Sequence, residues 1–525
     1  MSKRLVLTAI LIAVLVGVSS LSFKVQKVEA SGTIYIRADG SIDPPTVPIS
    51  TTDNVTYTFT GNVYDSIVVE RDNIIIDGAG YNLQGAGEGG LVGIELSERR
   101  NVKVTNVTIQ NFDSGIFSSS LCPSRNNSIV GIRLADIRRG ISLEFSSNNT
   151  ITGNVFTGCG LALKGSYGNL VEDNLVNGKP LVYLEGVSDY VVEDAGQVIL
   201  FSCNNILVEN LNLSYTNYAI QLGGTNNSII RNNNIIARDI YVDRSILLFA
   251  SSNNNSIVGN NIVNNSYGMW IESSSDNNSI VGNNIVNNSY GIFHGGGSHN
   301  NHIFHNNFIN NTQQEVTCDW SSQFWDNGYP SGGNYWSDYN GTDLLKGPYQ
   351  NLTGSDGVGD VPYKIPIVND TRHTIGFAYA SYSLMAPISI FDAGTWNGVP
   401  YYVNVVSNST VSNFRFNPEE GAFIHFNVTG EDGTSGFCRV TIPKSLLWVE
   451  DGWTITVGDR PISDYTIIPD ENYTYVYFAY NHSTQTVIIQ GTSVIPEFPS
   501  AIIMPLMMAL TTLAVAVPKK RKPKT

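Results

Sequence analysis

A 15-residue segment, NNSIVGNNIVNNSYG, occurs twice in this chain, beginning at Asn254 and at Asn277, 23 residues later. A third, degenerate copy, NNHIFHNNFINN, begins at Asn300. A repeat this short, rich in Ile, Val, Asn and Gly and lacking a helical stripe, cannot bury its apolar side chains alone and must stack on its neighbours. The repeat therefore predicts a solenoid of β-coils at the centre of the chain.

The same pattern continues upstream with less regular spacing. Each short apolar run ends in an Asn, and the aligned positions are Asn154, Asn174, Asn210, Asn232, Asn260, Asn283 and Asn306. Asn tolerates the left-handed backbone of a corner, and its amide can hydrogen-bond to the Asn of the next coil. We expect about ten coils of right-handed parallel β-helix over residues 65–315, with these Asn residues stacked at one corner.

Apolar positions recur at the same 23-residue offset and should point inward, forming the core of the stack. They are Ile257, Ile262 and Met269, then Ile280, Ile285 and Ile292, and then Ile303 and Phe308. Upstream, a 28-residue gap between aligned Asn residues carries an inserted charged loop. Its charged residues are Arg238, Asp239, Asp243 and Arg244.

Both ends of the chain indicate export. Residues 1–30 combine a basic start, an apolar stretch from Leu5 to Val18 and a small-residue site at Ala30, as in a signal peptide. Near the other end, an apolar segment from Ala501 to Val517 is about long enough to cross a bilayer and is followed by a basic tail. We expect an extracellular, cell-surface protein that a single C-terminal segment anchors to the membrane.

The tripeptide Pro496-Glu497-Phe498 precedes that apolar segment. Pro-Glu-Phe, then a hydrophobic span, then a basic tail resembles the PEF-type sorting signal of archaeal surface proteins. The resemblance implies an archaeal source and an archaeosortase as a processing partner. It leaves open whether the mature anchor is the helix or a lipid.

Composition agrees with export and excludes one class of partner. The net charge of -15 argues against nucleic acid, which requires a basic face. Five Cys residues include no C-x-x-C spacing, and their odd number leaves at least one thiol unpaired within the chain. N-glycosylation sequons are abundant, and the candidate acceptors include Asn54, Asn212, Asn351, Asn427 and Asn472.

An aromatic stretch, DWSSQFWDNGYPSGGNYWSDYNGTD, follows the last coil. Bulky aromatics can cap the open end of a solenoid, which otherwise exposes a strand edge and an apolar cross-section. The alternative is a platform on which sugar rings stack, with Trp320, Trp325 and Trp336 as candidates. The sequence favours the cap.

This stretch, together with GSDGVGD at residues 354–360 and Val361-Pro362-Tyr363, resembles the end of the archaeal NosD-type β-helix family. The resemblance covers about residues 33 to 370. It implies the β-helix fold, and a role as a periplasmic copper-binding protein or as a carbohydrate-binding or sugar-hydrolase domain. No motif in the sequence by itself supplies a copper site.

Two metal sites can be drawn from the residues. His302 and His305 replace Ser279 and Gly282 by the 23-residue offset and could face outward as copper ligands, whereas His294 takes an inward Ile position. Asp356 and Asp360 resemble a short Asp-Gly calcium loop, with Asp338 and Asp343 as further oxygen donors. The alternatives are polar decoration of the rod and a hydrogen-bonded turn.

The segment 376–491 changes to alternating apolar and polar runs separated by turns, which predicts an immunoglobulin-like β-sandwich. The expected organisation is all-β. Its parts are a signal peptide (1–30), an N-terminal strand and cap region (31–64), the β-helix (65–315), an aromatic cap (316–375), a sandwich stalk (376–491), and a Pro-Glu-Phe, transmembrane and basic tail (492–525).

The sequence favours a non-catalytic surface protein for envelope structure, adhesion or glycan contact. Polysaccharide cleavage needs two placed carboxylates, or a calcium site with a basic residue. The inserted loop, with Asp239 and Asp243, is the best candidate for such a site. A carbohydrate-active enzyme and a copper-binding protein remain the two alternatives.

Overall fold

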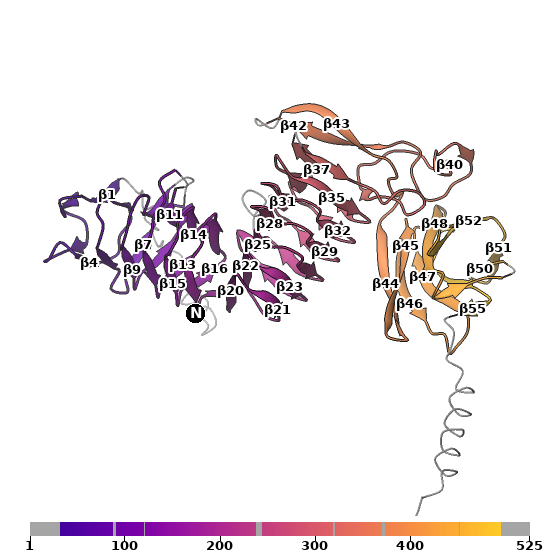
Figure 1. The fold of residues 1–525 in the computed structure, drawn as a ribbon, viewed down its shortest axis with the longest axis horizontal. Helices are drawn as coiled ribbons and strands as arrows, with labels where there is room; N and C mark the ends of the chain where they lie inside the picture. The colour runs from indigo at the N-terminus through magenta and orange to yellow at the C-terminus, as the bar shows by residue number, and fades with distance from the viewer. Residues whose placement is uncertain are drawn as a thin grey trace, which may run out of the picture. The chain divides into compact units, whose positions relative to one another are not determined.

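The computed structural model describes residues 32–87, 91–119, 121–237, 244–318, 321–369, 373–450 and 452–494. Every regular element in these ranges is a β-strand (Figure 1). No helix among them has the length and apolar character needed to span a bilayer. The predicted signal peptide and the apolar segment from Ala501 to Val517 lie outside the described residues. The chain divides into two compact units, Met1–Gly178 and Lys179–Thr525.

Unit 1 is a parallel β-solenoid built from three sheets. The first contains β1 (Thr33–Ile36), β5 (Ser66–Val69), β8 (Val92–Glu95), β11 (Ser114–Ser118), β14 (Arg139–Glu144) and β17 (Leu161–Lys164). The second contains β4 (Thr56–Phe59), β6 (Ile75–Asp77), β9 (Lys103–Thr105), β12 (Ser128–Val130), β15 (Thr150–Thr152) and β18 (Leu170–Glu172). The third contains β7 (Asn82–Gln84), β10 (Thr108–Gln110), β13 (Arg133–Ala135), β16 (Val155–Thr157) and β19 (Leu175–Val176).

The parallel ladder begins earlier than the sequence indicated. Strand β1 pairs in parallel with β5, and β4 pairs in parallel with β6. Only the short strands β2 (Ile42–Asp43) and β3 (Ile49–Ser50) run antiparallel there, against β1 and β4. The region that the sequence assigns to an N-terminal strand and cap (31–64) thus contains β1 and β4, which pair with the coil that follows.

Unit 2 continues the same architecture and then adds a cap and a sandwich. Its first sheet contains β20 (Lys179–Glu185), β22 (Gln197–Phe201), β25 (Tyr218–Gly223), β28 (Arg244–Phe249), β31 (Tyr267–Ile271), β34 (Tyr290–His294), β37 (Gln313–Cys318), β42 (Tyr363–Val368) and β43 (Thr374–Ala380). The second contains β21 (Ser188–Val192), β23 (Asn204–Glu209), β26 (Ile229–Arg231), β29 (Ser256–Val258), β32 (Ser279–Val281), β35 (His299–Phe304) and β38 (Ser322–Phe324). The third contains β24 (Asn212–Ser214), β27 (Asn234–Ile236), β30 (Asn261–Val263), β33 (Asn284–Val286), β36 (Asn307–Ile309) and β39 (Tyr335–Trp336). The described residues of the two units contain about 11 turns of right-handed solenoid.

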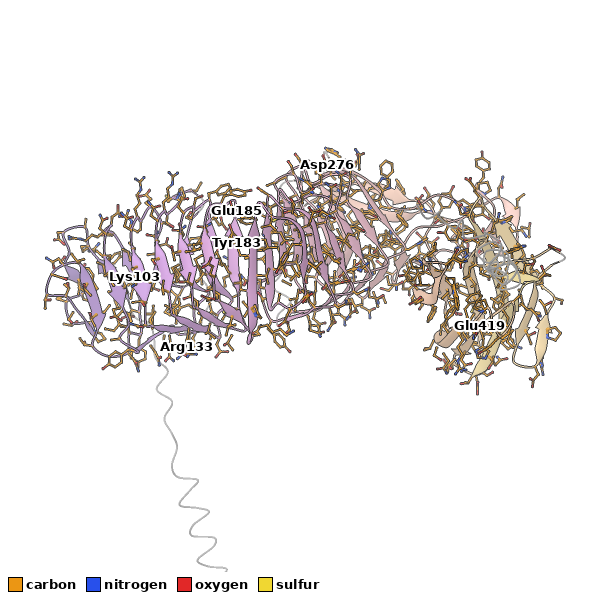
Figure 2. All side chains as sticks on the ribbon, turned by 60° about the horizontal axis from the view of Figure 1, so that its bottom comes forward. Lys103, Arg133, Tyr183, Glu185, Asp276 and Glu419 are labelled. Carbon is orange, nitrogen blue, oxygen red and sulfur yellow. The ribbon has the colours of Figure 1, made fainter. Side chains whose placement is uncertain are left out.

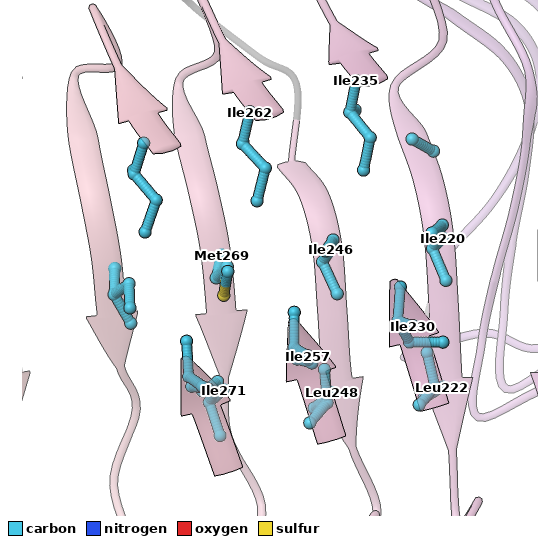
Figure 3. Close-up of a cluster of buried hydrophobic side chains, with 14 of the residues drawn as sticks. Ile220, Leu222, Ile230, Ile235, Ile246, Leu248, Ile257, Ile262, Met269 and Ile271 are labelled. Atoms are coloured by element: carbon cyan, nitrogen blue, oxygen red, sulfur yellow. The ribbon is translucent and has the colours of Figure 1, made fainter. Parts of the chain in front are cut away.

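The core of the unit 2 solenoid consists of the predicted apolar columns. Ile257, Ile280 and Ile303 are consecutive parallel partners, and each is fully buried. Figure 3 shows the same arrangement in the coils just before: Ile230 and Ile257 lie side by side in one row, Ile235 and Ile262 in a second, and Ile246 and Met269 in a third. The 23-residue offset therefore predicted the strand register correctly.

Asparagine ladders run along the solenoid. In unit 2 one ladder joins Asn233, Asn260, Asn283, Asn306 and Asn334 through side-chain amide bonds of 2.9–3.0 Å. A second joins Asn255, Asn278, Asn301 and Gln323. A third joins Asn265, Asn288 and Asn311. In unit 1, Asn154 donates to Asn174 in the same way.

The predicted ladder needs correcting at two positions and in its physical reason. Asn210 and Asn232 lie one residue before the ladder, which passes through Leu211 and Asn233. The left-handed backbone also belongs to the preceding residue, as at Asn232 (φ 55°). The ladder Asn instead takes no left-handed conformation and uses its amide to satisfy buried main-chain groups of the neighbouring coil.

Two antiparallel sheets follow and enclose one apolar core. The first contains β44 (Ile388–Trp396), β45 (Val399–Ser407), β48 (Ser435–Pro443), β53 (Tyr473–Asn481) and β52 (Tyr465–Pro469). The second contains β46 (Thr410–Phe416), β47 (Phe423–Thr429), β54 (Gln485–Gln490), β50 (Thr454–Val457) and β51 (Arg460–Ile462). Two further antiparallel pairs form, from β40 (Leu345–Lys346) with β41 (Leu352–Thr353), and from β49 (Leu447–Trp448) with β55 (Ser493–Val494). The predicted sandwich is therefore present, with its core centred on Phe426, Val440 and Phe478.

Candidate functional site

The predicted glycan-stacking tryptophans close the end of the solenoid. Trp336 is fully buried, stacked between Phe308 and Tyr363 with ring centroids 4.4 Å from each. Trp325 is 8% exposed and donates from Nε1 to Oε1 of Glu315 at 2.6 Å. Neither ring offers a free face to a sugar, and both act as a cap. Trp320 lies outside the described residues.

A polar pair replaces apolar side chains inside the last coils. His294 takes the position of Ile271, as the repeat predicted, and Glu315 takes that of Ile292. Nε2 of His294 lies 2.8 Å from Oε1 of Glu315, and both side chains are fully buried. No solvent reaches this pair, so it offers no open site. Its hydrogen bond links two neighbouring coils inside the end of the core.

The two predicted copper ligands point to different surroundings. His302 is exposed, and its ring stacks on that of Phe324, 4.7 Å away. His305 is buried, and its Nε2 lies 3.0 Å from the carbonyl oxygen of Ser331. Burial lowers the pKa of His305 to about 4, so the ring is neutral and donates from Nε2 to that carbonyl. Nε2 is therefore engaged by that carbonyl, and Nδ1 keeps the lone pair of the ring.

The predicted calcium loop is filled by hydrogen bonds from the protein itself. The carboxylate of Asp356 accepts from the amide of Val358 and from Gln350 Nε2, and that of Asp360 accepts from the amides of Leu344 and Leu345. The carboxylate of Asp343 accepts from the main-chain amides of Asp356 and Gly357. Burial raises the pKa of Asp343 to about 7, against the effect of these amides.

These carboxylates do not fit a cation site. Arg439 approaches Asp356 and offsets part of the effect by which burial raises the pKa of that carboxyl. A guanidinium beside the carboxylate opposes the approach of a second cation. Across the described ranges, no group of three or more His, Cys, Asp or Glu side chains is placed to hold a metal. Cys122, Cys203 and Cys438 carry free thiols.

Most of the candidate glycosylation acceptors are accessible. Asn54, Asn212, Asn351 and Asn472 are exposed. Asn427 is half-buried, and its Oδ1 accepts a hydrogen bond from Thr486. In the NNS repeats the acceptor is the first Asn of each doublet, and at Asn254 and Asn277 it is exposed, while the second Asn forms the ladder.

One surface of unit 2 gathers aromatic side chains that the sequence analysis did not single out. Phe201, Phe249, Trp270 and Phe293 project from the first sheet on the side opposite the apolar columns, because each follows an inward side chain along its strand. Tyr267 and Tyr290 begin their strands, and their rings contact those of Trp270 and Phe293. We refer to the whole set as the aromatic face. Its members are Tyr183, Phe201, Tyr218, Phe249, Tyr267, Trp270, Tyr290 and Phe293.

The aromatic face has a buried floor and a partly exposed polar rim. The floor consists of Tyr267, Trp270 and Phe293, and the rim consists of Tyr183, Glu185, Tyr218, Arg244, Glu272 and Tyr290. Trp270 and Phe293, with ring centroids 4.5 Å apart, are almost wholly covered, and Tyr267 stacks on Tyr290 at 4.8 Å. The guanidinium of Arg244 lies 4.0 Å from the centre of the Trp270 ring and donates to the Tyr218 hydroxyl at 3.0 Å. Arg244 belongs to the predicted charged loop, whose other charged residues, Arg238, Asp239 and Asp243, lie outside the described residues.

Two glutamates border the aromatic face. Glu185 at the end of β20 accepts from the hydroxyl of Tyr183, and Figure 2 shows the two residues side by side on the surface. Glu272, which follows β31, accepts from Trp270 Nε1 at 2.9 Å. Phe201 and Phe249, 5.9 Å apart, meet edge to face over Gly223, where a Cβ atom would lie 2.8 Å from the Phe249 ring. The glycine thus allows the two rings to close over the strand between them.

The sequence did contain a signal for this face. The repeats place Tyr267-Gly-Met-Trp270 and Tyr290-Gly-Ile-Phe293 at equivalent positions. Met269 and Ile292 were recognised as inward, so their neighbours Trp270 and Phe293 had to face outward. Strand alternation applied to the repeat would have identified the pair.

Comparison with known proteins gives a family match that covers just over half of the chain. The family model described as periplasmic copper-binding protein (NosD) matches residues 68–196 and 187–341. No protein with a curated description matches the chain.

Solved structures give only distant matches. The A-module of the Azotobacter vinelandii mannuronan C-5 epimerase AlgE6 is 13% identical, with 55% of this chain and 71% of that chain covered and a TM-score of 0.21. An alginate lyase from Paenibacillus sp. str. FPU-7 is 14% identical, with 53% and 97% covered and a TM-score of 0.22. A tailspike protein of E. coli bacteriophage HK620 in complex with pentasaccharide is 12% identical, with 89% and 86% covered and a TM-score of 0.27. Overlaps of this quality carry no argument about the chemistry of this chain.

Proposed function

The chain belongs to the periplasmic copper-binding protein (NosD) family, and on that premise we propose that it is a non-catalytic envelope protein whose aromatic face binds a linear glycan. The observation that supports the glycan is the pairing of a buried aromatic floor with a half-exposed rim of Tyr, Arg and Glu side chains. The partly exposed rings of Tyr183, Tyr218 and Tyr290 favour the faces of sugars, and the polar rim can hydrogen-bond their hydroxyls. The buried rings beneath hold these tyrosines in place.

The spacing of the rim favours binding over cleavage. Glu185 and Glu272 border the face four strands apart, which corresponds to about 19 Å at a strand spacing of ~4.8 Å. Acid and base carboxylates that hydrolyse a glycosidic bond lie about 5–9.5 Å apart. A chain that lies along the solenoid axis would instead meet a new coil, and a new set of rim groups, every ~4.8 Å.

Binding to immobilised glycans tests the proposal. Tyr290→Ala removes a half-exposed ring and Glu272→Gln removes a rim charge, and each should weaken binding of the retained glycan severalfold. Tyr190→Ala is the matched control, because Tyr190 is an exposed tyrosine on β21, in another sheet of the same unit. Equal binding by all three variants, or no retained glycan at all, would reject the aromatic face as the site.

A carbohydrate-active enzyme is the first alternative. Incubating the protein with pectic and envelope glycans, with and without calcium, reveals any product. Loss of product in Asp239→Ala or Asp243→Ala would place catalysis in the inserted loop and replace the binding proposal.

Copper binding is the second alternative, and it is supported by the match to a family of periplasmic copper-binding proteins. The described side chains of His302 and His305 do not meet in a ligand group, as their separate contacts show. Metal analysis of the purified protein, and its repetition with both residues changed to Ala, decides the matter. Stoichiometric copper that disappears in the double variant would establish the alternative.

The proposed location is the cell surface. In this arrangement the sandwich is an immunoglobulin-like stalk. The apolar C-terminal segment anchors the chain to the membrane. If an archaeosortase processes the chain at the Pro-Glu-Phe motif, that segment is removed. The exposed sequons carry glycans. Mass spectrometry of the natural protein tests both modifications at once, through the mass of its C-terminal peptide and of the peptides that contain Asn212 and Asn351.

A further inference from the structure

Strand β43 ends the first sheet of unit 2 and has an open edge. It pairs with β42 in antiparallel orientation, and the described residues provide no strand on its other side (Figure 1). The small side chain of Ala378 packs against the solenoid core, so the strand is held on one face. On the other face Ile375, Phe377 and Tyr379 are 56%, 49% and 56% exposed.

Open edges of this kind are usually protected. Proteins place charges, prolines or bulges on edge strands because unpaired main-chain groups are a template for another strand. The edge strands of the sandwich in this chain follow the rule. β44 carries Asp392 and a bulge, β46 carries Arg415 and a bulge, β51 carries Arg460 and Pro461, and β52 carries Pro469.

β43 lacks this protection over most of its length. Its sequence, TIGFAYA, has no charged residue and no proline. A register shift is confined to its first residues, between the partners of Ile367 and Val368, and the pairing from Gly376 to Ala380 is regular. The contrast with the sandwich edges indicates that this edge is kept open for pairing.

We propose that β43 pairs with β43 of a second copy of this chain, in antiparallel orientation about a two-fold axis at Ala378. In this register Phe377 of each copy lies opposite Tyr379 of the other, and Gly376 lies opposite Ala380. Aromatic cross-strand pairs stabilise antiparallel sheets, and a two-fold axis uses the same surface on both copies. The sheet that begins at β20 then continues from one copy into the other.

The uncharged sequence of β43 favours a second copy, because the strand can pair with itself without placing like charges opposite each other. The chain has a net charge of -15, so two copies repel each other over most surfaces. The uncharged edge of β43 avoids this repulsion. Beside it lies Lys364, whose Nζ is 5.9 Å from the centre of the Phe377 ring and belongs to the paired strand β42. Lys364 is thus the neighbour's charge, and β43 itself offers no pattern of charge for a foreign protein to recognise.

Sedimentation of the full-length chain in detergent over a range of concentrations tests the proposal. The wild type should form dimers. The double variant Phe377→Lys, Tyr379→Lys places like charges opposite each other and should weaken association by about tenfold or more. Tyr402→Lys is the matched control, because Tyr402 is similarly exposed but lies on β45, inside a sheet.

A charge exchange separates pairing from misfolding. A second variant carries Phe377→Glu and Tyr379→Glu, and mixing it with the lysine variant should restore dimers that neither forms alone. A wild type that remains monomeric at all accessible concentrations would overturn the proposal. So would dimers that persist in the lysine variant, or lipid vesicles that bind the wild type through these residues without dimers forming.

Discussion

Arg439 of the sandwich donates from Nε to the main-chain carbonyl oxygen of Asp356 in the cap, 2.9 Å away, although both residues are almost fully buried. The guanidinium also donates to the carbonyl of Pro330 and lies 4.6 Å from the centre of the Tyr475 ring. Gly357 makes the approach possible, since it has a φ of +81° and a Cβ atom there would lie 2.6 Å from Cδ of Arg439. This side chain is thus one of the contacts that join the sandwich to the cap at the end of the solenoid.

Arg439→Met should be strongly destabilising. It leaves two buried carbonyls without a donor and removes the cation beside the buried Asp356 carboxyl, a loss of about 3–5 kcal/mol. Urea unfolding followed by tryptophan fluorescence measures the change. Arg415→Met, at an exposed arginine on β46, is the control and should leave the midpoint within experimental error.

His305 should make the fold sensitive to mild acid. Its pKa falls from the ordinary 6.5 to about 4 because burial disfavours the charged ring. The unfolded chain therefore takes up a proton that the folded chain does not, and stability falls as the pH drops from about 6.5 to about 4, by about 3 kcal/mol in all. His305→Asn should remove this loss, because Asn accepts the left-handed backbone at that corner (φ 57°).

The matched control is His302→Asn at the exposed neighbour, which should retain the acid sensitivity.

Asp343 acts in the opposite direction. Its pKa is raised to about 7, so its contribution to stability is present at low pH and is lost as the pH rises from about 4 to about 7. The two effects overlap, and thermal unfolding across this range separates them only in single variants such as His305→Asn and Asp343→Asn.

Asn283→Ala tests the internal ladder. The change removes the acceptor of the Asn260 main-chain amide and the side-chain donor to the carbonyl of Ile257, each costing about 1–3 kcal/mol. The side-chain amide of Asn260 loses one of its two hydrogen bonds and keeps the one to Ile230. Asn284→Ala removes an exposed amide in the next position and should cost well under half as much. Chemical unfolding measures the loss of unfolding free energy in each variant. Equal losses would show that the buried ladder amide stabilises the fold no more than the exposed amide does.

Truncation after Val494 should release the protein from the cell. The cut keeps β55, which pairs with β49 and completes the sandwich. It removes the Pro-Glu-Phe motif and the apolar segment on which the proposed anchor depends. Immunoblots of medium and membranes measure the distribution. Retention of the truncated chain on the cell would show that another anchor exists.

How far the sequence predicted the fold depended on how regular the repeat was. Where two copies are identical, the offset placed Ile280 on Ile257 and Asn283 on Asn260 correctly. Upstream, the ladder position is held by Leu211, and the run Asn232-Asn233-Asn234 admits three alignments. The alignment there chose the exposed corner residue because spacing alone does not distinguish it from its buried neighbour.

The site was harder to predict, because contacts in it join distant parts of the chain. Trp325 and Trp336 were recognised as a cap from composition alone, but Arg439 lies 83 residues after Asp356, and nothing in its neighbourhood marks it as buried. The calcium loop was suggested by its Asp and Gly spacing. Its carboxylates turned out to bind main-chain amides of the same cap, which a sequence pattern cannot reveal.

The side chain of Asn307 forms two hydrogen bonds with Ile388 in the first strand of the sandwich. Its Nδ2 donates to the main-chain carbonyl of Ile388, and its Oδ1 accepts from the main-chain amide of Ile388, both at 2.8 Å. Asn307 also donates to Asn284 in the coil before it. A pull on the C-terminal end of the sandwich would therefore load the last coil through this amide and through Arg439 together. Mechanical tension would then pass into the hydrogen-bonded stack of coils, which shares it among many parallel bonds, and the junction would be the first place to yield.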